Sequence, residues 1–151
     1  MTKTLQELLA IGIKAEMEAI DAYSKLAENI DNILLQERFS TLSKDEQRHK
    51  IILEQIYEEN FPGVPLSLPA KSGVPKVHPI ISKENSITDI LSIAMDAEKK
   101  AEDYYHDLAA QMDNQIKKDL LNYLANIENG HFYFLKLEYD RSKNRSKKES
   151  Q

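Results

Sequence analysis

Apolar residues recur at intervals of three and four along four long stretches of the chain, which predicts four amphipathic helices. The first three stretches span about residues 4–29 and 32–59 and a segment that begins at Ser86, and the fourth spans about 114–140. Each stretch is long enough for a helix of a bundle, and its spacing suits left-handed bundle packing. The pattern therefore predicts an all-α protein.

Two of the predicted helices begin with a capping signal. Thr4 is followed three residues later by Glu7, and Ser86 is followed three residues later by Asp89. In such a capping box each side chain accepts a hydrogen bond from the backbone N–H of the other residue. We therefore expect helices to start at these two positions.

The connections between the stretches differ in length. The first and second stretches meet at "ENIDNIL", and the third and fourth meet at "AQMDNQI", so both connections are short and each pair should form an antiparallel hairpin. Residues 61–86, between the two hairpins, contain all five prolines of the chain. Proline disrupts a helix interior, so we predict an extended crossover that runs along the bundle.

The two predicted hairpins are copies of each other. An offset of 82 residues, the separation of Glu16 from Glu98, superposes many identical residues without a gap. The matched pairs include Glu16 and Glu98, Ala19 and Ala101, Tyr23 and Tyr105, Leu26 and Leu108, Glu46 and Glu128, His49 and His131, and Leu53 and Leu135. We interpret the chain as a duplicated helical hairpin that forms a four-helix bundle.

Charged residues interrupt the apolar stripe of every predicted helix at matched places. "DEQRH" at 45–49 and "IENGH" at 127–131 are both Glu-x-x-His motifs, whose two side chains lie on one face of a helix. Glu16 and Glu98 each precede the glutamate of the motif in the same hairpin by 30 residues. Because a tight turn lies midway, each of these glutamates reaches the same height in the bundle as its motif.

Four glutamates and two histidines in an apolar interior would be strongly unfavourable as bare charges. Two divalent metal ions would neutralise the four carboxylates. We therefore predict a two-metal site in which Glu46 and Glu128 bridge the ions, Glu16 and Glu98 are terminal ligands, and His49 and His131 complete the set. The alternative is a degenerate bundle that binds no metal, but the presence of all six residues argues against it.

Ligand chemistry narrows the choice of metal. Oxygen and nitrogen donors without thiolate favour two iron ions, with manganese or a mixed iron and manganese pair as alternatives and zinc as an occupant of isolated protein. Six protein groups leave coordination positions open for O2 or peroxide. Tyr23 and Tyr105 lie two turns beyond Glu16 and Glu98, so their hydroxyls are expected to bond to the carboxylates, with simple core packing as the alternative.

Composition limits the other classes of function. The 151 residues suit one domain, over residues 1–140, and the absence of cysteine excludes disulfides, iron–sulfur clusters and zinc bound by cysteine. No stretch resembles a signal peptide or a membrane span, so we expect a cytoplasmic protein with no membrane partner. Cysteine-free composition agrees with a reducing compartment.

Charge is unevenly distributed along the chain. The whole chain has a net charge of −5, and residues 141–151 hold five basic residues and one glutamate. Residues 1–140 therefore have a net charge of −9, from 15 basic and 24 acidic residues. The negative charge of residues 1–140 would repel the phosphates of nucleic acid, so nucleic acid is an unfavourable partner. We predict that 141–151 form a basic disordered tail. The aromatic run Phe132, Tyr133 and Phe134 is expected to be covered by the crossover or, as we favour, by a second copy in a homodimer.

Paired Glu and Glu-x-x-His hairpins joined by one crossover resemble the ferritin-like di-iron carboxylate superfamily, and over about residues 4–140 they look most like its rubrerythrin branch. The resemblance implies a ferritin-like bundle with a non-haem di-iron centre that reduces hydrogen peroxide, or reacts with O2, in protection against oxidative stress. Rubrerythrin proper also carries a cysteine-ligated rubredoxin iron. Without cysteine, this chain would need a separate electron donor.

A second departure from the family affects the predicted chemistry. Family members often carry an additional glutamate three residues after the ligand of the third helix, where this chain has Ala101; Glu102 is adjacent. Our leading hypothesis is a di-iron peroxidase or oxidase. The alternatives are a ferrous-iron binding protein with ferroxidase activity, a di-metal oxidase or hydroxylase of an organic substrate, and a scaffold without metal.

Overall fold

The computed structural model describes residues 2–74 and 86–149, and it contains the four predicted helices. Helix α1 spans Leu5–Asn29, α2 spans Ile33–Asn60, α3 spans Ile87–Ala110 and α4 spans Gln115–Glu149. No strand occurs within the described ranges, so the predicted all-α class is confirmed. None of the helices that the structure describes combines the length and apolar character needed to cross a bilayer.

Capping begins the helices where the sequence predicted it. The Thr4 hydroxyl accepts a hydrogen bond from the backbone N–H of Glu7 at 3.1 Å, and the Thr4 N–H donates to the Glu7 carboxylate at 2.8 Å. Ser86 and Asp89 form the same reciprocal pair at the start of α3. Both predicted capping boxes are therefore present.

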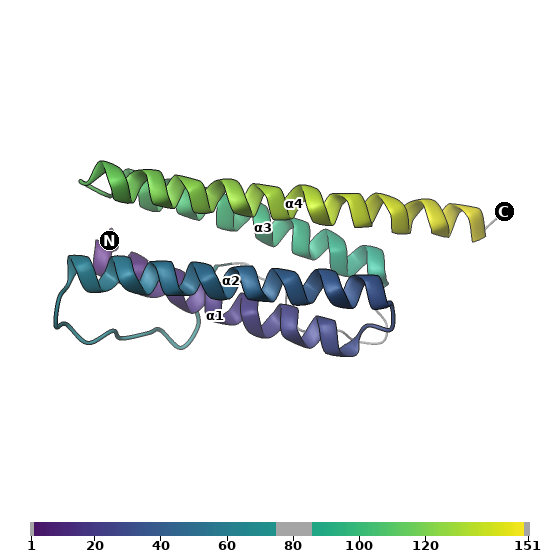
Figure 1. Ribbon diagram of the computed structural model, residues 1–151, viewed down its shortest axis with the longest axis horizontal. Coiled ribbons are helices and arrows are strands. Elements are labelled where there is room, and N and C mark those ends of the chain that lie inside the picture. The colour runs from purple at the N-terminus through teal and green to yellow at the C-terminus, as the bar shows by residue number, and fades with distance from the viewer. Residues whose placement is uncertain (1, 75–85, 150–151) are drawn as a thin grey trace.

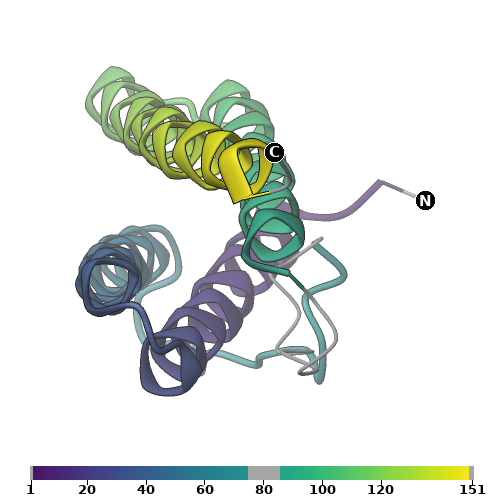
Figure 2. The same ribbon diagram turned by 90° about the vertical axis from the view of Figure 1, so that its right-hand side faces the viewer.

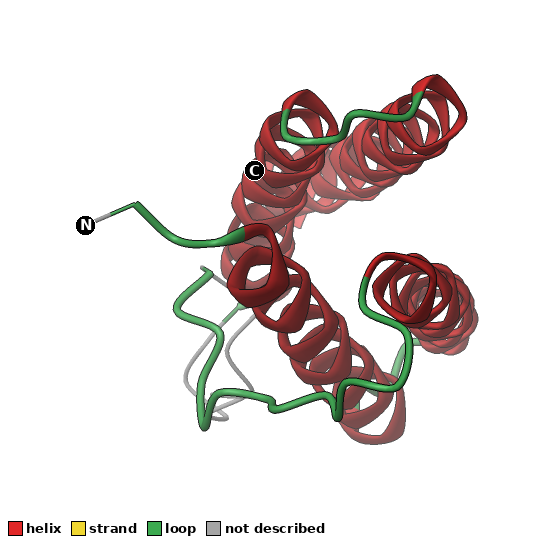
Figure 3. Ribbon diagram, turned by 90° about the vertical axis from the view of Figure 1, so that its left-hand side faces the viewer, coloured by secondary structure: helices red, strands yellow, loops and turns green. Residues whose placement is uncertain are grey.

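The helices pair into two antiparallel hairpins, α1 with α2 and α3 with α4 (Figure 1). The two hairpins stack as layers, with contacts of α1 on α3 and of α2 on α4 (Figures 2 and 3). Helix α2 ends and α3 begins at opposite ends of the bundle, so the crossover returns the chain along its length (Figure 1). Gly12 allows a close approach here, because a Cβ would lie 3.3 Å from Tyr104 Cε1.

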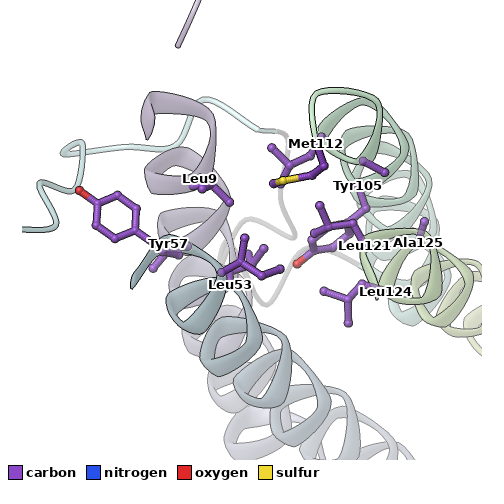
Figure 4. Packing of buried hydrophobic residues seen from close by; sticks show 12 residues of the cluster. Leu9, Leu53, Tyr57, Tyr105, Met112, Leu121, Leu124 and Ala125 are labelled. Atoms are coloured by element: carbon purple, nitrogen blue, oxygen red, sulfur yellow. The ribbon is translucent and has the colours of Figure 1, made fainter. Parts of the chain in front are cut away.

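Buried apolar side chains form two clusters, one toward each end of the bundle. The first contains Leu9, Ile13, Leu53, Leu121 and Leu124, and Figure 4 shows side chains from all four helices converging in it. The second contains Leu26, Phe39, Leu42, Leu91 and Leu135. Burial of these side chains supplies the main driving force for folding. The layer between the two clusters holds the predicted metal ligands.

The structure corrects the prediction for the C-terminus. Helix α4 continues to Glu149, and its end lies beyond the other three helices, so a disordered tail is wrong for residues 141–149 (Figure 1). Lysine and arginine are good helix formers, and no glycine or proline interrupts this stretch. Positive side chains near a helix C-terminus also interact favourably with its dipole.

The part of the crossover that the structure describes agrees with an extended segment. Residues 61–74 contain no helix or strand, and the backbone N–H of Ser72 donates to Glu18 on α1 at 2.8 Å. The remainder of the predicted crossover, residues 75–85, lies outside the described residues. Tyr133 and Leu137 of α4 are 59% and 48% exposed, and a homodimer through this surface stays a prediction.

Candidate metal centre

All six predicted metal ligands lie in the buried layer between the two apolar clusters. Their exposed fractions range from 1% to 7%, values typical of core residues. Each helix contributes, because the helical period keeps each charged side chain in register with the inward apolar stripe. The residues brought together are Glu16 from α1, Glu46 and His49 from α2, Glu98 from α3, and Glu128 and His131 from α4.

The six side chains form two groups of four that share two members. Within each group, one ligand atom per residue lies within 4.8 Å of the corresponding atoms of the others. Glu46 and Glu128 belong to both groups. Glu16 and His49 complete the first group, and Glu98 and His131 complete the second. This geometry matches the arrangement of two terminal and two shared carboxylates that the duplicated sequence predicts.

Each histidine reaches across to the other hairpin. His49 Nδ1 lies 2.7 Å from Glu128 Oε1, and His131 Nδ1 lies 3.1 Å from Glu46 Oε1. The two imidazole rings are nearly parallel, with centroids 6.0 Å apart. Both Nδ1 atoms therefore point into the carboxylate cluster.

Unsatisfied polar atoms test whether these residues suit metal ions. Each of the six side chains has one buried oxygen or nitrogen atom that makes no hydrogen bond of good geometry among the described residues, although the two Nδ1 atoms lie within ion-pair distance of glutamate oxygens. Buried polar atoms are normally hydrogen-bonded, because an unpaired one costs about 1–3 kcal/mol. Six such atoms in one layer are explained if they ligate cations, and four carboxylates balance two divalent ions. The donor set therefore fits a two-metal centre, as in the di-metal helical bundles.

Two tyrosines hold the terminal carboxylates from the opposite hairpin. The Tyr23 hydroxyl donates a hydrogen bond to Glu98 Oε1 at 2.5 Å, and the Tyr105 hydroxyl donates to Glu16 Oε1. Burial, followed by the charge of the bonded glutamate, raises the pKa of both phenols well above its usual value. Both hydroxyls thus remain protonated donors, which confirms the predicted hydrogen bonds to the carboxylates.

Sequence reasoning missed one residue that contacts a predicted ligand. Asp45 Oδ2 lies 3.1 Å from His131 Nε2, the ring nitrogen that faces away from the cluster. Asp45 is the first residue of "DEQRH", and the matching position of "IENGH" is Ile127. This difference between the two motifs was the available signal.

A small cavity adjoins the six residues between α1 and α3. It has a volume of about 40 Å³, and its walls include all four glutamates. Its apolar lining includes Tyr23, Val74 and four alanines, two from each helix: Ala15, Ala19, Ala97 and Ala101. The alanines are matched pairs of the internal repeat, so small residues on both helices leave this space open.

Glu102 lies outside both four-residue groups. Its carboxylate pairs with Lys99 Nζ at 3.1 Å, on a side chain that is 19% exposed. Ala101, at the position of the additional family glutamate, lines the cavity instead. In this conformation Glu102 does not replace the missing carboxylate.

Protons balance part of the negative charge in the metal-free cluster. Burial, and then the charges of neighbouring carboxylates, raise the pKa of Glu46 and Glu128 well above the usual range. Burial opposes a charged His131, but Glu46 and Glu98 outweigh that effect and raise its pKa to about 11. Burial also acts to raise the pKa of Glu98, yet nearby His131 lowers it overall. Metal binding must displace the protons of Glu46, Glu128 and His131.

We expect the metal-free protein to lose thermal stability as the pH rises from about 5 to about 9. Glu46, Glu128 and His131 all have a raised pKa in the folded state. The stability that these groups contribute is therefore present below their pKa in the unfolded chain and is lost as the pH rises toward their pKa in the folded protein. For His131 this range extends from 6.5 to about 11. Glu98 acts oppositely, but only as the pH falls below the ordinary carboxyl range.

Thermal denaturation in the presence of a chelator, across this pH range, measures the effect. Glu128→Gln should make the melting temperature less dependent on pH, because an amide does not take up or release a proton in this range. Glu138→Gln is the matched control, since Glu138 is a buried glutamate paired with Arg38 and Arg141 outside the cluster. A melting temperature that increased with pH in the wild type would contradict this assignment of protons.

Comparison with known proteins identifies relatives of the chain. A sequence model of the rubrerythrin family, described as Rubrerythrin, matches residues 7–139. The solved structure of a hypothetical protein from Pyrococcus furiosus is 35% identical, with a TM-score of 0.86 and coverage of 93% of this chain and 91% of that chain. No curated protein matches the sequence.

A second solved structure supports the fold at lower identity. It belongs to a candidate ferritin-like diiron-carboxylate protein from Thermotoga maritima, and it is 21% identical with a TM-score of 0.76. The alignment covers 93% of this chain and 97% of that chain. The ferritin-like bundle predicted from the duplicated hairpins is confirmed.

Proposed function

Because this chain belongs to the rubrerythrin family, we propose that it is a non-haem di-iron oxidoreductase that reduces hydrogen peroxide, or reacts with O2, in protection against oxidative stress. One observation carries the proposal. Six buried side chains, each with a polar atom that makes no hydrogen bond of good geometry, converge in two groups that share Glu46 and Glu128. Shared carboxylates would hold two cations close together, and two ferrous ions can together supply the two electrons that cleave one O–O bond.

Two ferrous ions, when bound, would supply the two electrons that, with two protons, convert one hydrogen peroxide into two water molecules. The residues of the chain supply the remaining requirements. One ion would be bound by Glu16 and His49, and the other by Glu98 and His131. The shared glutamates would bind both ions. Tyr23 and Tyr105 fix the orientation of the terminal carboxylates through their hydroxyl hydrogen bonds.

The size of the adjoining cavity favours a small oxidant over an organic substrate. About 40 Å³ accommodates two or three water-sized molecules, and hence O2 or hydrogen peroxide. Pockets for organic ligands usually measure about 300–1,000 Å³. The walls combine glutamate oxygens with the alanines of α1 and α3, so an oxidant in the cavity would lie beside the ligands.

We expect the electrons for repeated turnover to come from a separate donor. The chain has no cysteine and therefore no rubredoxin-type iron of its own. We expect the donor to be a second protein or a small reductant. An artificial reductant can replace it in the assay.

The reaction is tested by stopped-flow mixing of reduced, iron-loaded protein with hydrogen peroxide or O2. We expect faster oxidation by peroxide than by O2, and repeated turnover when a reductant is added. Absence of reaction with both oxidants would exclude the proposed function. Oxidation by O2 alone, in a shell of many subunits by light scattering, would instead favour iron storage.

A cavity variant tests the role assigned to the four alanines. Ala101→Leu should fill part of the cavity and slow oxidation by peroxide by about tenfold, equivalent to about 1.4 kcal/mol in the barrier. Its iron content should be unchanged, because Ala101 ligates nothing. Ala110→Leu is the control, since Ala110 is exposed at the end of α3. Equal rates for wild type and Ala101→Leu would show that the oxidant enters elsewhere.

A further inference from the structure

The contacts around the two metal positions obey the internal repeat. Four contacts from one hairpin to the other form two pairs, and within each pair the residues are related by the repeat offset. The hydroxyl bonds are Tyr23 to Glu98 and Tyr105 to Glu16, and the imidazole contacts are His49 to Glu128 and His131 to Glu46. The ligands alone would therefore make the two metal positions nearly equivalent.

One contact breaks this symmetry. His131 Nε2 bonds to Asp45 Oδ2 at 3.1 Å, while Asp45 Oδ1 accepts a hydrogen bond from Arg48 Nη1 at 2.9 Å. The positions that match Asp45 and Arg48 in the other hairpin are Ile127 and Gly130, neither of which has a side-chain acceptor or donor. Among residues 2–74 and 86–149, the histidine of α4 is thus the one cluster histidine with a carboxylate bonded to its Nε2 atom.

This bond determines which ring nitrogen of His131 is available to bind a cation. An ionised carboxylate can only accept, so the bond to Asp45 holds a proton on Nε2. The Nδ1 lone pair of a neutral ring then faces Glu46 and Glu98, at 3.1 and 3.5 Å. A carboxylate behind a ligating histidine also fixes the ring orientation and increases its basicity.

We propose that Asp45, held by Arg48, is a positioning residue that makes the two metal positions unequal, so that the ion at Glu98 and His131 binds more tightly and first. This inference rests on the two-metal centre of the proposed function. Loss of such a partner typically lowers metal affinity by about 10–100-fold, so the two binding steps should differ by about that factor. The ion at Glu16 and His49 would bind in the weaker step.

Titration of Co²⁺ into the metal-free full-length protein tests the inequality. Calorimetry and the visible absorption of Co²⁺ should resolve two steps that differ by about 10–100-fold. His49→Ala should retain the tighter step, and His131→Ala should retain only the weaker one. Equal steps in the wild type, or loss of the tighter step in His49→Ala, would overturn the proposal. Absence of any Co²⁺ binding would instead exclude the two-metal centre itself.

Variants of Asp45 separate its role from a structural one. Asp45→Ala should weaken the tighter step by at least about tenfold and leave the weaker step unchanged. Asp45→Asn should restore part of the loss, because its amide oxygen still accepts from Nε2. The control is Asp21→Ala, which removes an exposed carboxylate that pairs with Lys25 on the same helix, away from the cluster. Equal weakening of both steps, or unchanged steps in Asp45→Ala, would contradict the proposal.

Discussion

Replacing Glu46 by glutamine is expected to remove both metal ions from the protein, whereas replacing Glu16 by glutamine should remove one. Glu46 belongs to both groups of potential ligands, and Glu16 belongs to one. A carboxylate shared in this way would neutralise and connect both ions, so its loss should weaken each position. Metal content should therefore fall from about two ions per chain to nearly none in Glu46→Gln, and to about one in Glu16→Gln.

Elemental analysis after equilibration with Fe²⁺ under anaerobic conditions and removal of free metal measures the content. Glu128→Gln should behave like Glu46→Gln, because the repeat makes the two residues equivalent. Glu138→Gln provides a matched control, since this glutamate is also buried but bonds to arginines. One ion retained by Glu46→Gln would show that the shared position is not a bridge.

The second large effect that we expect is thermal stabilisation by metal. Binding only to the folded state at about 1,000 times the dissociation constant stabilises by about 4 kcal/mol per site, or about 8 kcal/mol for two sites. For a chain of this size each kcal/mol raises the melting temperature by about 2–4 °C. Saturation should therefore raise it by about 15–30 °C, and a chelator should reverse the change.

The same measurement separates stability from metal binding. In metal-free protein at neutral pH, Glu128→Gln should raise the melting temperature, because burial forces Glu128 to take up a proton on folding, whereas the amide is neutral without one. Added metal should stabilise this variant far less than the wild type. Glu138→Gln should respond to metal like the wild type. A wild-type melting temperature that metal did not change would argue against ions in the cluster.

A conflict between function and stability underlies these expectations. Natural cores rarely contain several unpaired carboxylates, because each one opposes folding. Here the two apolar clusters above and below the polar layer hold the helices together without metal. The bundle can therefore maintain a cluster of ligands that is unfavourable until cations bind.

Local signals accounted for most of the helix boundaries. Thr4 and Ser86 begin α1 and α3 because capping depends on residues only three positions apart. The end of α4 was predicted wrongly, since the charge of residues 141–149 was taken to indicate a solvated, disordered tail. The lysines and arginines in this stretch favour helix, no glycine or proline interrupts it, and this preference requires no packing against the bundle.

At the site, too, features set by spacing along one helix could be predicted, whereas contacts between residues far apart in the sequence could not. Glu-x-x-His places two ligands on one helical face by spacing alone, and the repeat places the second copy opposite the first. By contrast, the bond from Asp45 to His131 joins residues 86 positions apart on α2 and α4. Its geometry depends on how far the two hairpins are rotated against each other, which no periodicity encodes.

The sequence by itself determined the four helices, their duplication and the six candidate ligands, because each follows from helical spacing and from the free energy of burying charge. Only the tertiary structure decided which tyrosine meets which glutamate, that a cavity of about 40 Å³ lies beside the ligands, and that Asp45 serves one histidine. Those features depend on contacts between hairpins, where side-chain shape and helix packing select among partners that are equally compatible with the sequence pattern.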